Sequence, residues 1–301
     1  GEKMKGKTFF ESLKHSRLYY FFRTAFSPPI GKGLAVAGRY LTCGAAQKEL
    51  AHLDKFTVSG AIIWRSAPVL VRFMEQDSEL RVKLRGAKVI ELGSGLGLVG
   101  MAAGVLGSRT AVLCDRRIPS AFSSASATAT QQLQQLKALH NNVLRNLGST
   151  HRIICHFTSP PKVHEPPKQP ARLGAPDVVV EELSFGDLAK AGSVAMQFGP
   201  FDYVLGSDIT YLRDALPALA ATVKVLACHP ASDLHSRRSA RVTHSTRVLL
   251  AHERRGAAGE ACVVAALENQ GFAVTRALET EDIVVFSAHI TEDTKSDHST
   301  T

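Results

Sequence analysis

The residues that could do chemistry gather at points where an apolar run ends. The first group lies in segment 88–100, which reads KVIELGSGLGLVG and holds Glu91, Gly93, Gly95 and Gly97. Glycine permits positive φ and lets the backbone approach a ligand closely. The apolar run that follows is long enough for a helix, whose first turn offers unpaired N–H groups and the positive end of a dipole. Strand, glycine turn and helix together predict a nucleotide site.

The spacing of this segment fits two cofactors. Gly95-x-Gly97-x-x-Gly100 matches the dinucleotide fingerprint, and Asp115 lies 20 residues after Gly95, where an NAD-binding unit places its ribose acid. Read from Glu91, the segment is E-x-G-x-G-x-G, with which S-adenosylmethionine (AdoMet) methyltransferases begin their nucleotide loop. In that interpretation Glu91 faces the amino group of the cofactor and Asp115 binds the ribose hydroxyls. A glycine turn that binds nothing is the third alternative.

A second group follows a later apolar strand in segment 201–211, FDYVLGSDITY. Ligands in open α/β sheets bind outside the carboxyl ends of the strands, which is where Asp208 is expected. A helix is predicted over 213–226, so Asp208 could instead serve as its N-cap. Both roles stay open at this point.

The only tryptophan, Trp64, precedes a predicted helix capped by Ser66 with Pro68 in its first turn. A lone tryptophan is usually a core residue, but this position just ahead of the nucleotide strand makes a role beside the cofactor a close second alternative. Asn142 and Asn146 share one face of another predicted helix. They either face solvent or support the nucleotide loop from behind.

Strands and helices alternate from about residue 88, with one strand pair at the end. The seven main strands are predicted at 89–92, 110–114, 177–180, 201–205, 246–251, 272–277 and 283–288, with a short strand at 56–58 and a possible further strand at 152–156. Helices are predicted at 98–106, 131–147, 213–226 and 260–270. The link between the last two strands is short, so they must be antiparallel. The fold class is therefore α/β: a Rossmann-like, seven-stranded, mostly parallel sheet with an antiparallel C-terminal hairpin and helices on both faces.

Composition narrows the function classes. The 301 residues are 45% hydrophobic and carry a net charge of +9, with basic residues scattered rather than gathered in a stripe. A generally basic surface is therefore favoured over a nucleic-acid interface. No window approaches the ~20 apolar residues of a membrane span. The five cysteines lack C-x-x-C spacing, which indicates reduced thiols. Cys155-His156 with His151 has no second ligand pair, so no metal site is expected.

The rest of the chain favours AdoMet over NAD. An NAD enzyme of this type needs a catalytic pair such as Tyr-x-x-x-Lys, and neither Tyr203 nor Tyr211 is followed by a lysine at that spacing. The terminal hairpin also favours the seven-strand methyltransferase sheet over a six-strand parallel unit.

Five segments, in order, resemble the seven-β-strand protein lysine methyltransferases of the family-16 type. They are the Gly-x-x-x-Trp segment 59–67, the cofactor loop 91–97 with its second-strand acid Asp115, the segment 183–186 similar to Leu-x-Trp-Gly, the Asp-x-x-Tyr signature at 208–211, and the segment 252–255 similar to Glu-x-Arg. The resemblance covers roughly residues 56–290. Phe185 stands where that family has a tryptophan, so contacts to the adenine there are expected to differ.

The resemblance implies AdoMet as cofactor and a lysine side chain of a protein as methyl acceptor. Asp208 would align the amine and Tyr211 would shape the transfer site. The residues implied in cofactor binding are Trp64, Glu91, Gly93, Ser94, Gly95, Gly97, Asp115, Leu183, Phe185 and Ser207. A nucleic-acid or small-molecule methyltransferase on the same fold and a non-catalytic AdoMet-binding module remain alternatives. NAD is a distant third.

The expected organisation is an N-terminal extension over 1–54, helical in part with a helix within 8–26, a methyltransferase domain over 55–290 and a polar tail over 291–301. Insertions are expected near 116–130, 158–176 and 229–245, the second of them as an extended loop rich in proline. The expected compartment is the cytoplasm, with the nucleus as an alternative, and the expected state is a monomer.

Overall fold

The computed structural model describes residues 32–43, 62–116, 133–158, 160–166, 176–228, 245–254 and 257–291. The helix expected within 8–26 and a short strand expected at 56–58 lie outside these residues. So do most of the insertions near 116–130 and 229–245.

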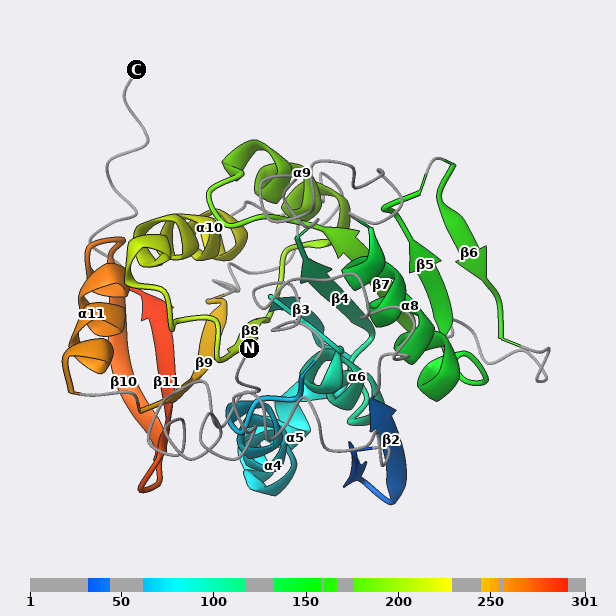
Figure 1. The fold of residues 1–301 in the computed structure, drawn as a ribbon, viewed down its shortest axis with the longest axis horizontal. Helices are drawn as coiled ribbons and strands as arrows, with labels where there is room; N and C mark the ends of the chain where they lie inside the picture. Colours follow the sequence, from blue (N-terminus) through cyan, green and yellow to red (C-terminus); the bar gives the residue numbers. More distant parts are fainter. Residues whose placement is uncertain are drawn as a thin grey trace, which may run out of the picture.

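One large sheet forms the centre of the molecule (Figure 1). Its strands lie in the order β10-β11-β9-β8-β3-β4-β7-β5-β6. Their bounds are β3 Lys88–Leu92, β4 Thr110–Asp115, β5 Arg152–Cys155, β6 Lys162–His164, β7 Asp177–Glu182, β8 Tyr203–Ser207, β9 Arg247–Glu253, β10 Phe272–Glu279 and β11 Ile283–Ile290. The strands from β9 to β5 run parallel, whereas β11, β10 and β6 are antiparallel to their neighbours.

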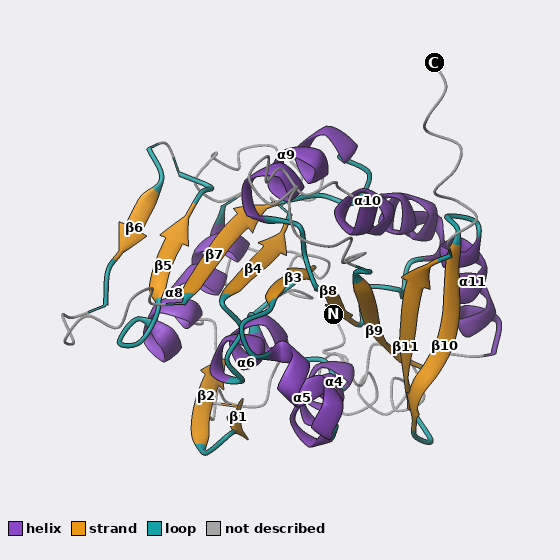
Figure 2. Ribbon diagram, turned by 180° about the vertical axis from the view of Figure 1, so that it is seen from behind, coloured by secondary structure: helices purple, strands orange, loops and turns teal. Residues whose placement is uncertain are grey.

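Helices cover both faces of this sheet, as Figures 1 and 2 show from opposite sides. One face carries α4 Ser66–Gln76, α5 Ser78–Leu84, α6 Leu98–Val105 and α8 Gln134–Leu147, and the other carries α9 Leu188–Phe198, α10 Leu216–Cys228 and α11 Ala257–Glu268. Side chains alternate along each strand, so Val89 packs into the first layer and Ile90 into the second. Because both faces are covered, the inner strands are apolar throughout instead of alternating with polar residues.

The structure confirms the predicted fold class and extends it at one edge. The order from β10 to β7 supplies seven strands with the terminal antiparallel hairpin, and β5 with β6 adds two more beyond β7. The strand β6 lies inside the segment predicted as an extended loop, so that prediction is wrong at 162–164. Its three residues are all exposed and leave no apolar pattern for sequence reasoning to detect.

Other elements also differ from the prediction. A two-stranded hairpin, β1 Lys32–Val36 with β2 Arg39–Cys43, packs on α6 and α8 in a part of the N-terminal extension for which no element was predicted. The helices α5 and α9 were not predicted. Ser66 does not cap α4: Arg65 is the N-cap residue, and the buried Ser66 hydroxyl has no hydrogen-bond partner.

Because the central strands are parallel, their carboxyl ends lie along one edge of the sheet. The loops after β3, β4, β7, β8 and β9 leave from that edge. The segments that resembled known methyltransferase motifs therefore meet there, as the topology of open α/β sheets requires of a ligand site.

Candidate functional site

The loop between β3 and α6 has the backbone geometry of a nucleotide cradle. Gly93, Gly95 and Gly97 have φ of 59°, 53° and 84°, a region that L side chains rarely adopt. Gly97 is also the N-cap residue of α6, so the loop delivers the unpaired N–H groups of the helix to the edge of the sheet. A side chain at Gly93 would place its Cβ 2.6 Å from Ile209 Cγ2. The loop needs glycine for its conformation and for its close approach to the segment after β8.

Glu91 lies under the loop. Its side chain is buried, and Oε2 accepts a hydrogen bond of 2.9 Å from the N–H of Gly100 in the first turn of α6. Burial raises the pKa of the Glu91 carboxyl to about 8, against the lowering effect of that N–H group. In this structure the carboxyl group faces the start of α6.

Asp115, the last residue of β4, lies on the other side of the loop. Its Oδ2 accepts a hydrogen bond of 2.7 Å from the N–H of Gly95, and its Oδ1 accepts one of 2.7 Å from Arg116. Desolvation raises the pKa of this carboxyl, while the two N–H groups lower it. The acid is half-buried, so a cofactor hydroxyl can reach it. This arrangement fits the predicted ribose acid, because a carboxylate has lone pairs left after accepting two N–H groups.

The helix α8 supports the loop from behind. Gln135 donates to the carbonyl of Gly95 at 2.9 Å, and Asn142 donates to the carbonyl of Leu96 at 3.2 Å. Asn146 accepts from the N–H of Thr42 at 2.8 Å and donates to its carbonyl at 2.7 Å. Both asparagines are therefore buried, but only Asn142 supports the loop as predicted, whereas Asn146 holds β2. Gln135 was missed because one glutamine in a polar helix carries no signal of its own.

The turn after β8 brings Asp208 to the glycine loop. Asp208 is buried and has φ of 52°, one of two described non-glycine residues in the left-handed region. Aspartate tolerates this region better than most residues, but the conformation still has to be held by its surroundings. Its N–H donates to the carbonyl of Ala251 in β9 at 2.8 Å. The next residue, Ile209, fills the space that Gly93 and Gly206 leave open.

The alternative role of Asp208 as a helix N-cap does not hold. The helical segment begins with a 3-10 turn, η3 Arg213–Ala215, whose N-cap residue is Leu212 without a side-chain bond, and α10 follows. Tyr211 and Leu212 are 43% and 47% exposed. Tyr211 therefore lies at the surface beside the buried Asp208, where an incoming substrate can contact it. Ser207, the last residue of β8, is half-buried at the same edge.

The segment after β7 forms another side of the site. Leu183 is buried, and Gly186 has φ of 89° and donates from its N–H to Thr222 Oγ1 of α10 at 2.8 Å. Phe185 lies beside the glycine loop: its Cζ would be 3.6 Å from a Cβ built at Gly93. The structure therefore places Phe185, Gly93 and Ile209 together, as a site for an apolar cofactor surface requires.

Arg65, the residue after Trp64, connects this segment to the edge of the sheet where the carboxyl ends of the strands lie. Arg65 forms an ion pair of 3.4 Å with Glu253 of β9 and a second ion pair with Asp282 in the turn between β10 and β11. Trp64 is half-buried, and its carbonyl accepts from the N–H of Ala67 at 3.1 Å. Its side chain is therefore not sealed in the core. The sequence does not predict the ion pair of Arg65, because its partner Glu253 lies 188 residues away.

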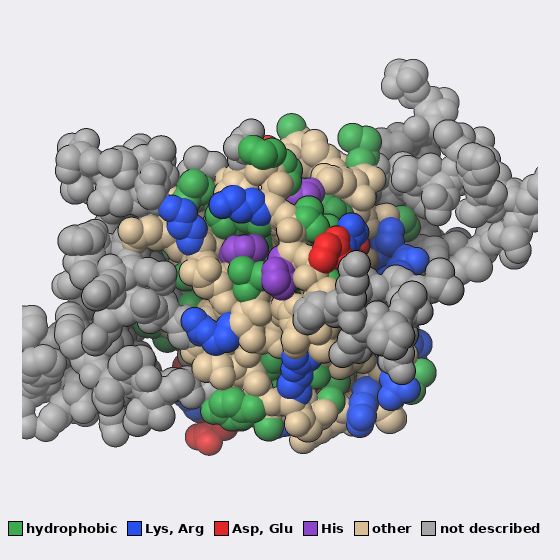
Figure 3. All heavy atoms as spheres, turned by 90° about the vertical axis from the view of Figure 1, so that its right-hand side faces the viewer, with side chains coloured by type: hydrophobic (Ala, Val, Ile, Leu, Met, Phe, Trp, Pro, Cys, Tyr) green, Lys and Arg blue, Asp and Glu red, His purple; other side chains and the backbone are tan. Residues whose placement is uncertain are grey.

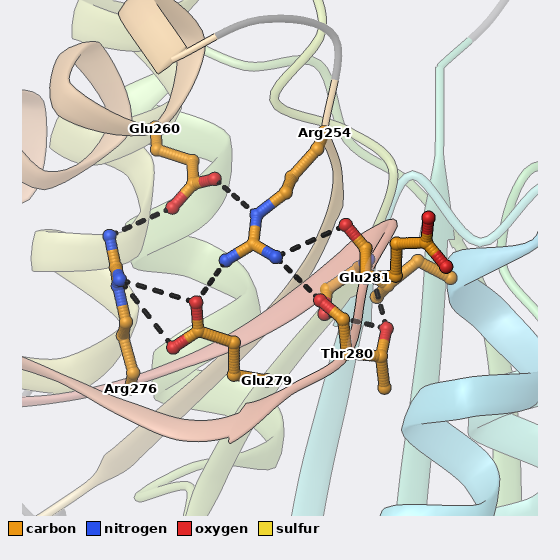
Figure 4. A network of polar contacts seen from close by, with 7 residues as sticks. Arg254, Glu260, Arg276, Glu279, Thr280 and Glu281 are labelled. Carbon is orange, nitrogen blue, oxygen red and sulfur yellow. Dashed lines mark hydrogen bonds and ion pairs between the residues drawn. The ribbon is translucent and has the colours of Figure 1, made fainter.

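The end of β9 is fixed by a polar network around Arg254 (Figure 4). The guanidinium group donates to Glu260 Oε1 at 2.7 Å, to Glu279, and to the carbonyls of Thr280 at 2.5 Å and Glu281 at 3.2 Å. Arg276 closes the network through Glu260 at 3.0 Å. Arg254 thus ties β9 to α11 and to the β10–β11 turn. Arg255, part of the predicted Glu-x-Arg segment, lies outside the described residues.

Within the described ranges, no group of three or more His, Cys, Asp or Glu side chains could hold a metal ion, and no helix is long and apolar enough to cross a membrane. A cavity of about 400 Å³ lies at the opposite, amino-terminal ends of β8 and β9. Its lining includes Arg247 and Asp202, together with Lys83, which pairs with Glu79 at 2.6 Å, so the charge there is mixed. Figure 3 shows lysine and arginine side chains spaced over the β5–β6 side of the molecule without merging into a stripe.

The strand order, the terminal hairpin and the glycine loop with its acids at the ends of β3, β4 and β8 define a Rossmann-like α/β fold with a candidate nucleotide site at one edge of the sheet. Residues 47–144 match the family described as "Lysine methyltransferase". The chain is also 31% identical over 163 residues to mouse "Protein N-lysine methyltransferase METTL21A", a match that covers 54% of this chain and 53% of the mouse protein. Over these parts of its length the chain is therefore similar to lysine methyltransferases.

Further relatives extend the comparison. "EEF1A lysine methyltransferase 3" of Xenopus tropicalis is 27% identical over 208 residues, covering 69% of this chain and 70% of that protein. The chain spans about half the length of the METTL21A relatives that it matches. Among solved structures, the 16S rRNA N2 G1207 methyltransferase (RsmC) of T. thermophilus aligns with a TM-score of 0.48 at 12% identity, covering 86% of this chain and 50% of that one.

Proposed function

We propose that the chain transfers a methyl group from AdoMet to a lysine side chain of a protein. The observation that carries the proposal is the position of Asp208. A buried aspartate at the carboxyl end of β8, held at φ of 52°, lies next to Ile209, which contacts the glycine loop. The family match and the named activities of the relatives favour lysine as the acceptor.

The residues at the edge of the sheet fit AdoMet. The turn with Gly93, Ser94, Gly95 and Gly97 would bring its carboxylate end to the start of α6, since the N–H groups of a helix start favour an anion. Asp115 would accept from the ribose hydroxyls. Glu91 would hold the start of α6 beneath the cofactor through Gly100. The apolar flank for the adenosine would come from Leu183, Phe185 and Trp64, with Ser207 at the floor of the site.

AdoMet supplies an activated methyl group, and the protein has to position and deprotonate the acceptor. A lysine amine must be neutral to attack, although its free pKa is about 10.4. Exclusion of water from the site lowers that pKa because burial disfavours the charged amine. Asp208 would accept a hydrogen bond from the amine and direct its lone pair. Tyr211, exposed beside it, would line the entrance for the side chain. Alignment of this kind is the main source of rate in such a displacement.

The test is transfer of label from methyl-labelled AdoMet to cell extract. Wild type, Asp208→Ala and Asp208→Asn are compared, and each sample is divided between protease and nuclease. Asparagine keeps the preference for positive φ and removes only the charge. The exposed Asp214→Asn, six residues along the chain, is the matched control. Purified EEF1A serves as one defined acceptor, because a relative is named for it.

We expect protease-sensitive label with wild type and with Asp214→Asn, and at least a hundredfold less with both Asp208 variants, in the range of a lost alignment group. AdoMet binding should stay within about threefold in Asp208→Asn, since the carboxylate acts on the acceptor. Nuclease-sensitive label would indicate a nucleic-acid methyltransferase instead. AdoMet binding without any transfer would indicate a non-catalytic module, and full activity of both Asp208 variants would refute the role of Asp208.

The compartment and the oligomeric state belong to the same proposal. We place the protein in the cytoplasm as a monomer; its five free cysteines fit a reducing compartment. Cell fractionation and light scattering of the purified protein measure the two properties directly.

A further inference from the structure

Thr210 and His252 form a buried pair within the candidate site. Thr210 lies in the turn after β8, two residues beyond Asp208 and directly before Tyr211, whereas His252 lies near the end of β9. Thr210 Oγ1 and His252 Nδ1 are 2.6 Å apart, and the two residues are only 3% and 2% exposed. A hydrogen bond this well shielded from water holds its partners more firmly than an exposed one.

The pair adds a second attachment of the turn to β9. The first is the main-chain bond of 2.8 Å from the N–H of Asp208 to the carbonyl of Ala251. That bond fixes only the start of the turn. The side-chain bond at Thr210 fixes its middle, so that the residues on either side, Ile209 and Tyr211, are held from the same strand. An aspartate at positive φ needs this support, because a strained backbone conformation persists only where several surrounding contacts hold it.

The histidine ring is itself confined. It packs against Phe286 of β11 with ring centroids 6.3 Å apart, and a Cβ built at Gly259 of α11 would be 3.5 Å from its Nε2. The next residue, Glu253, pairs with Arg65 at 3.4 Å. With β11 on one side and α11 on the other, the ring has little freedom, so it can act as a fixed point for Thr210.

We propose that His252 is a positioning residue, which holds Asp208 and Tyr211 in the geometry for methyl transfer through its hydrogen bond to Thr210. The inference rests on the proposed methyltransferase function. In this role His252 does not touch the cofactor or the acceptor. It fixes the position of the turn after β8, and this turn positions Asp208, which aligns the amine. Removing the bond therefore lowers the rate of transfer and leaves cofactor affinity unchanged.

Two pairs of substitutions, one at Thr210 and one at His252, separate the effect of the hydrogen bond from that of packing. Thr210→Val keeps the shape of the side chain and removes the hydroxyl, whereas Thr210→Ser removes a methyl group and keeps the hydroxyl. His252→Asn places an amide near the position of Nδ1, and His252→Leu has no polar group. Each variant is assayed for label transfer from methyl-labelled AdoMet to protein in cell extract at several AdoMet concentrations. AdoMet affinity is measured by calorimetry, and folding by thermal unfolding.

We expect Thr210→Val to lower the maximal transfer rate about tenfold, while the KM and Kd for AdoMet stay within about twofold, as a lost hydrogen bond felt in the transition state predicts. Thr210→Ser should stay within about threefold of wild type, and His252→Asn should retain more activity than His252→Leu. The double variant Thr210→Val/His252→Leu should be no slower than the slower single variant, because both remove one bond.

Equal maximal rates for Thr210→Val and Thr210→Ser, both folded, would overturn the inference. An equal loss of AdoMet affinity in Thr210→Val would also overturn it, since the bond would then support the cofactor site. A wild-type protein that binds AdoMet and transfers no label would refute the proposed function itself, and this role with it.

Discussion

Glu91 makes the stability of the fold depend on pH. Its carboxyl group is buried under the glycine loop, and burial raises its pKa from 4.5 to about 8. In the unfolded chain the group ionises at its ordinary pKa, so between pH 4.5 and about 8 the folded state binds the extra proton. Stability is therefore greatest below pH 4.5 for this group and falls as pH rises through the window.

The expected size of the effect follows from the shift. Each pH unit inside the window costs about 1.4 kcal/mol, so the wild-type protein loses about 3 kcal/mol of this contribution between pH 5.5 and 7.5. Glu91→Gln has nearly the same shape and cannot ionise. Its amide oxygen can still accept from Gly100, so the bond to the start of α6 survives. Its free energy of unfolding should therefore lack this pH dependence.

The assay is urea unfolding of wild type and Glu91→Gln at pH 5.5, 6.5 and 7.5. The stability of Glu91→Gln relative to wild type should rise by about 3 kcal/mol from the lowest pH to the highest. Effects of the substitution that do not depend on pH cancel in this comparison. The titration of Asp115 also cancels, because both proteins contain Asp115. Glu268→Gln, which removes an exposed carboxyl of α11, is the control. Parallel curves for wild type and Glu91→Gln would refute the reasoning.

Two further predictions concern the loop and its support. Gly93→Ala should destabilise the protein by about 1–3 kcal/mol and weaken AdoMet binding at least tenfold, because the residue has φ of 59° and its Cβ would meet Ile209 at 2.6 Å. Gly192 in α9 has open space where a Cβ would lie, so Gly192→Ala should stabilise the protein by about 0.5–1 kcal/mol. Comparing the thermal unfolding of Gly93→Ala and Gly192→Ala therefore separates backbone strain from helix propensity. Asn142→Ala leaves the buried carbonyl of Leu96 unpaired and should cost about 1–3 kcal/mol with weaker AdoMet binding by calorimetry, whereas the exposed neighbour Asn141→Ala should leave both unchanged. An Asn142→Ala protein that binds AdoMet as tightly as wild type would show that α8 does not support the loop.

The parts of the site that sequence reasoning found are those encoded locally. The apolar run before Glu91, the glycines at fixed spacing and the run after them each specify their own backbone, so the strand, loop and helix could be placed within a residue or two. The same holds for β8 and the turn at Asp208, and for the last two strands, where a short link leaves no choice but an antiparallel pair.

The parts that it missed depend on contacts between distant residues. Ser66 has the residue type of a cap, yet it is the first residue of α4 and is buried with no bond to the helix start. The strand β6 forms because β5 offers it an edge, and its own residues show no strand pattern. Thr210 and His252 are 42 residues apart in the sequence, so neither predicts the other.

The end of β9 shows why such contacts matter for the site. Four consecutive residues, Ala251 to Arg254, each bond to a different segment: the start of the Asp208 turn, its middle at Thr210, the residue after Trp64, and the β10–β11 turn. Side chains along a strand point alternately to the two faces of the sheet, and main-chain groups point to the neighbouring strands. One short stretch at the end of β9 can therefore contact all four segments. The acid that would align the acceptor is therefore positioned by a neighbouring strand that contributes no reacting group. A substitution that shifts β9 should for this reason disturb transfer more than cofactor binding, because most of the proposed cofactor contacts lie on the segments after β3, β4 and β7.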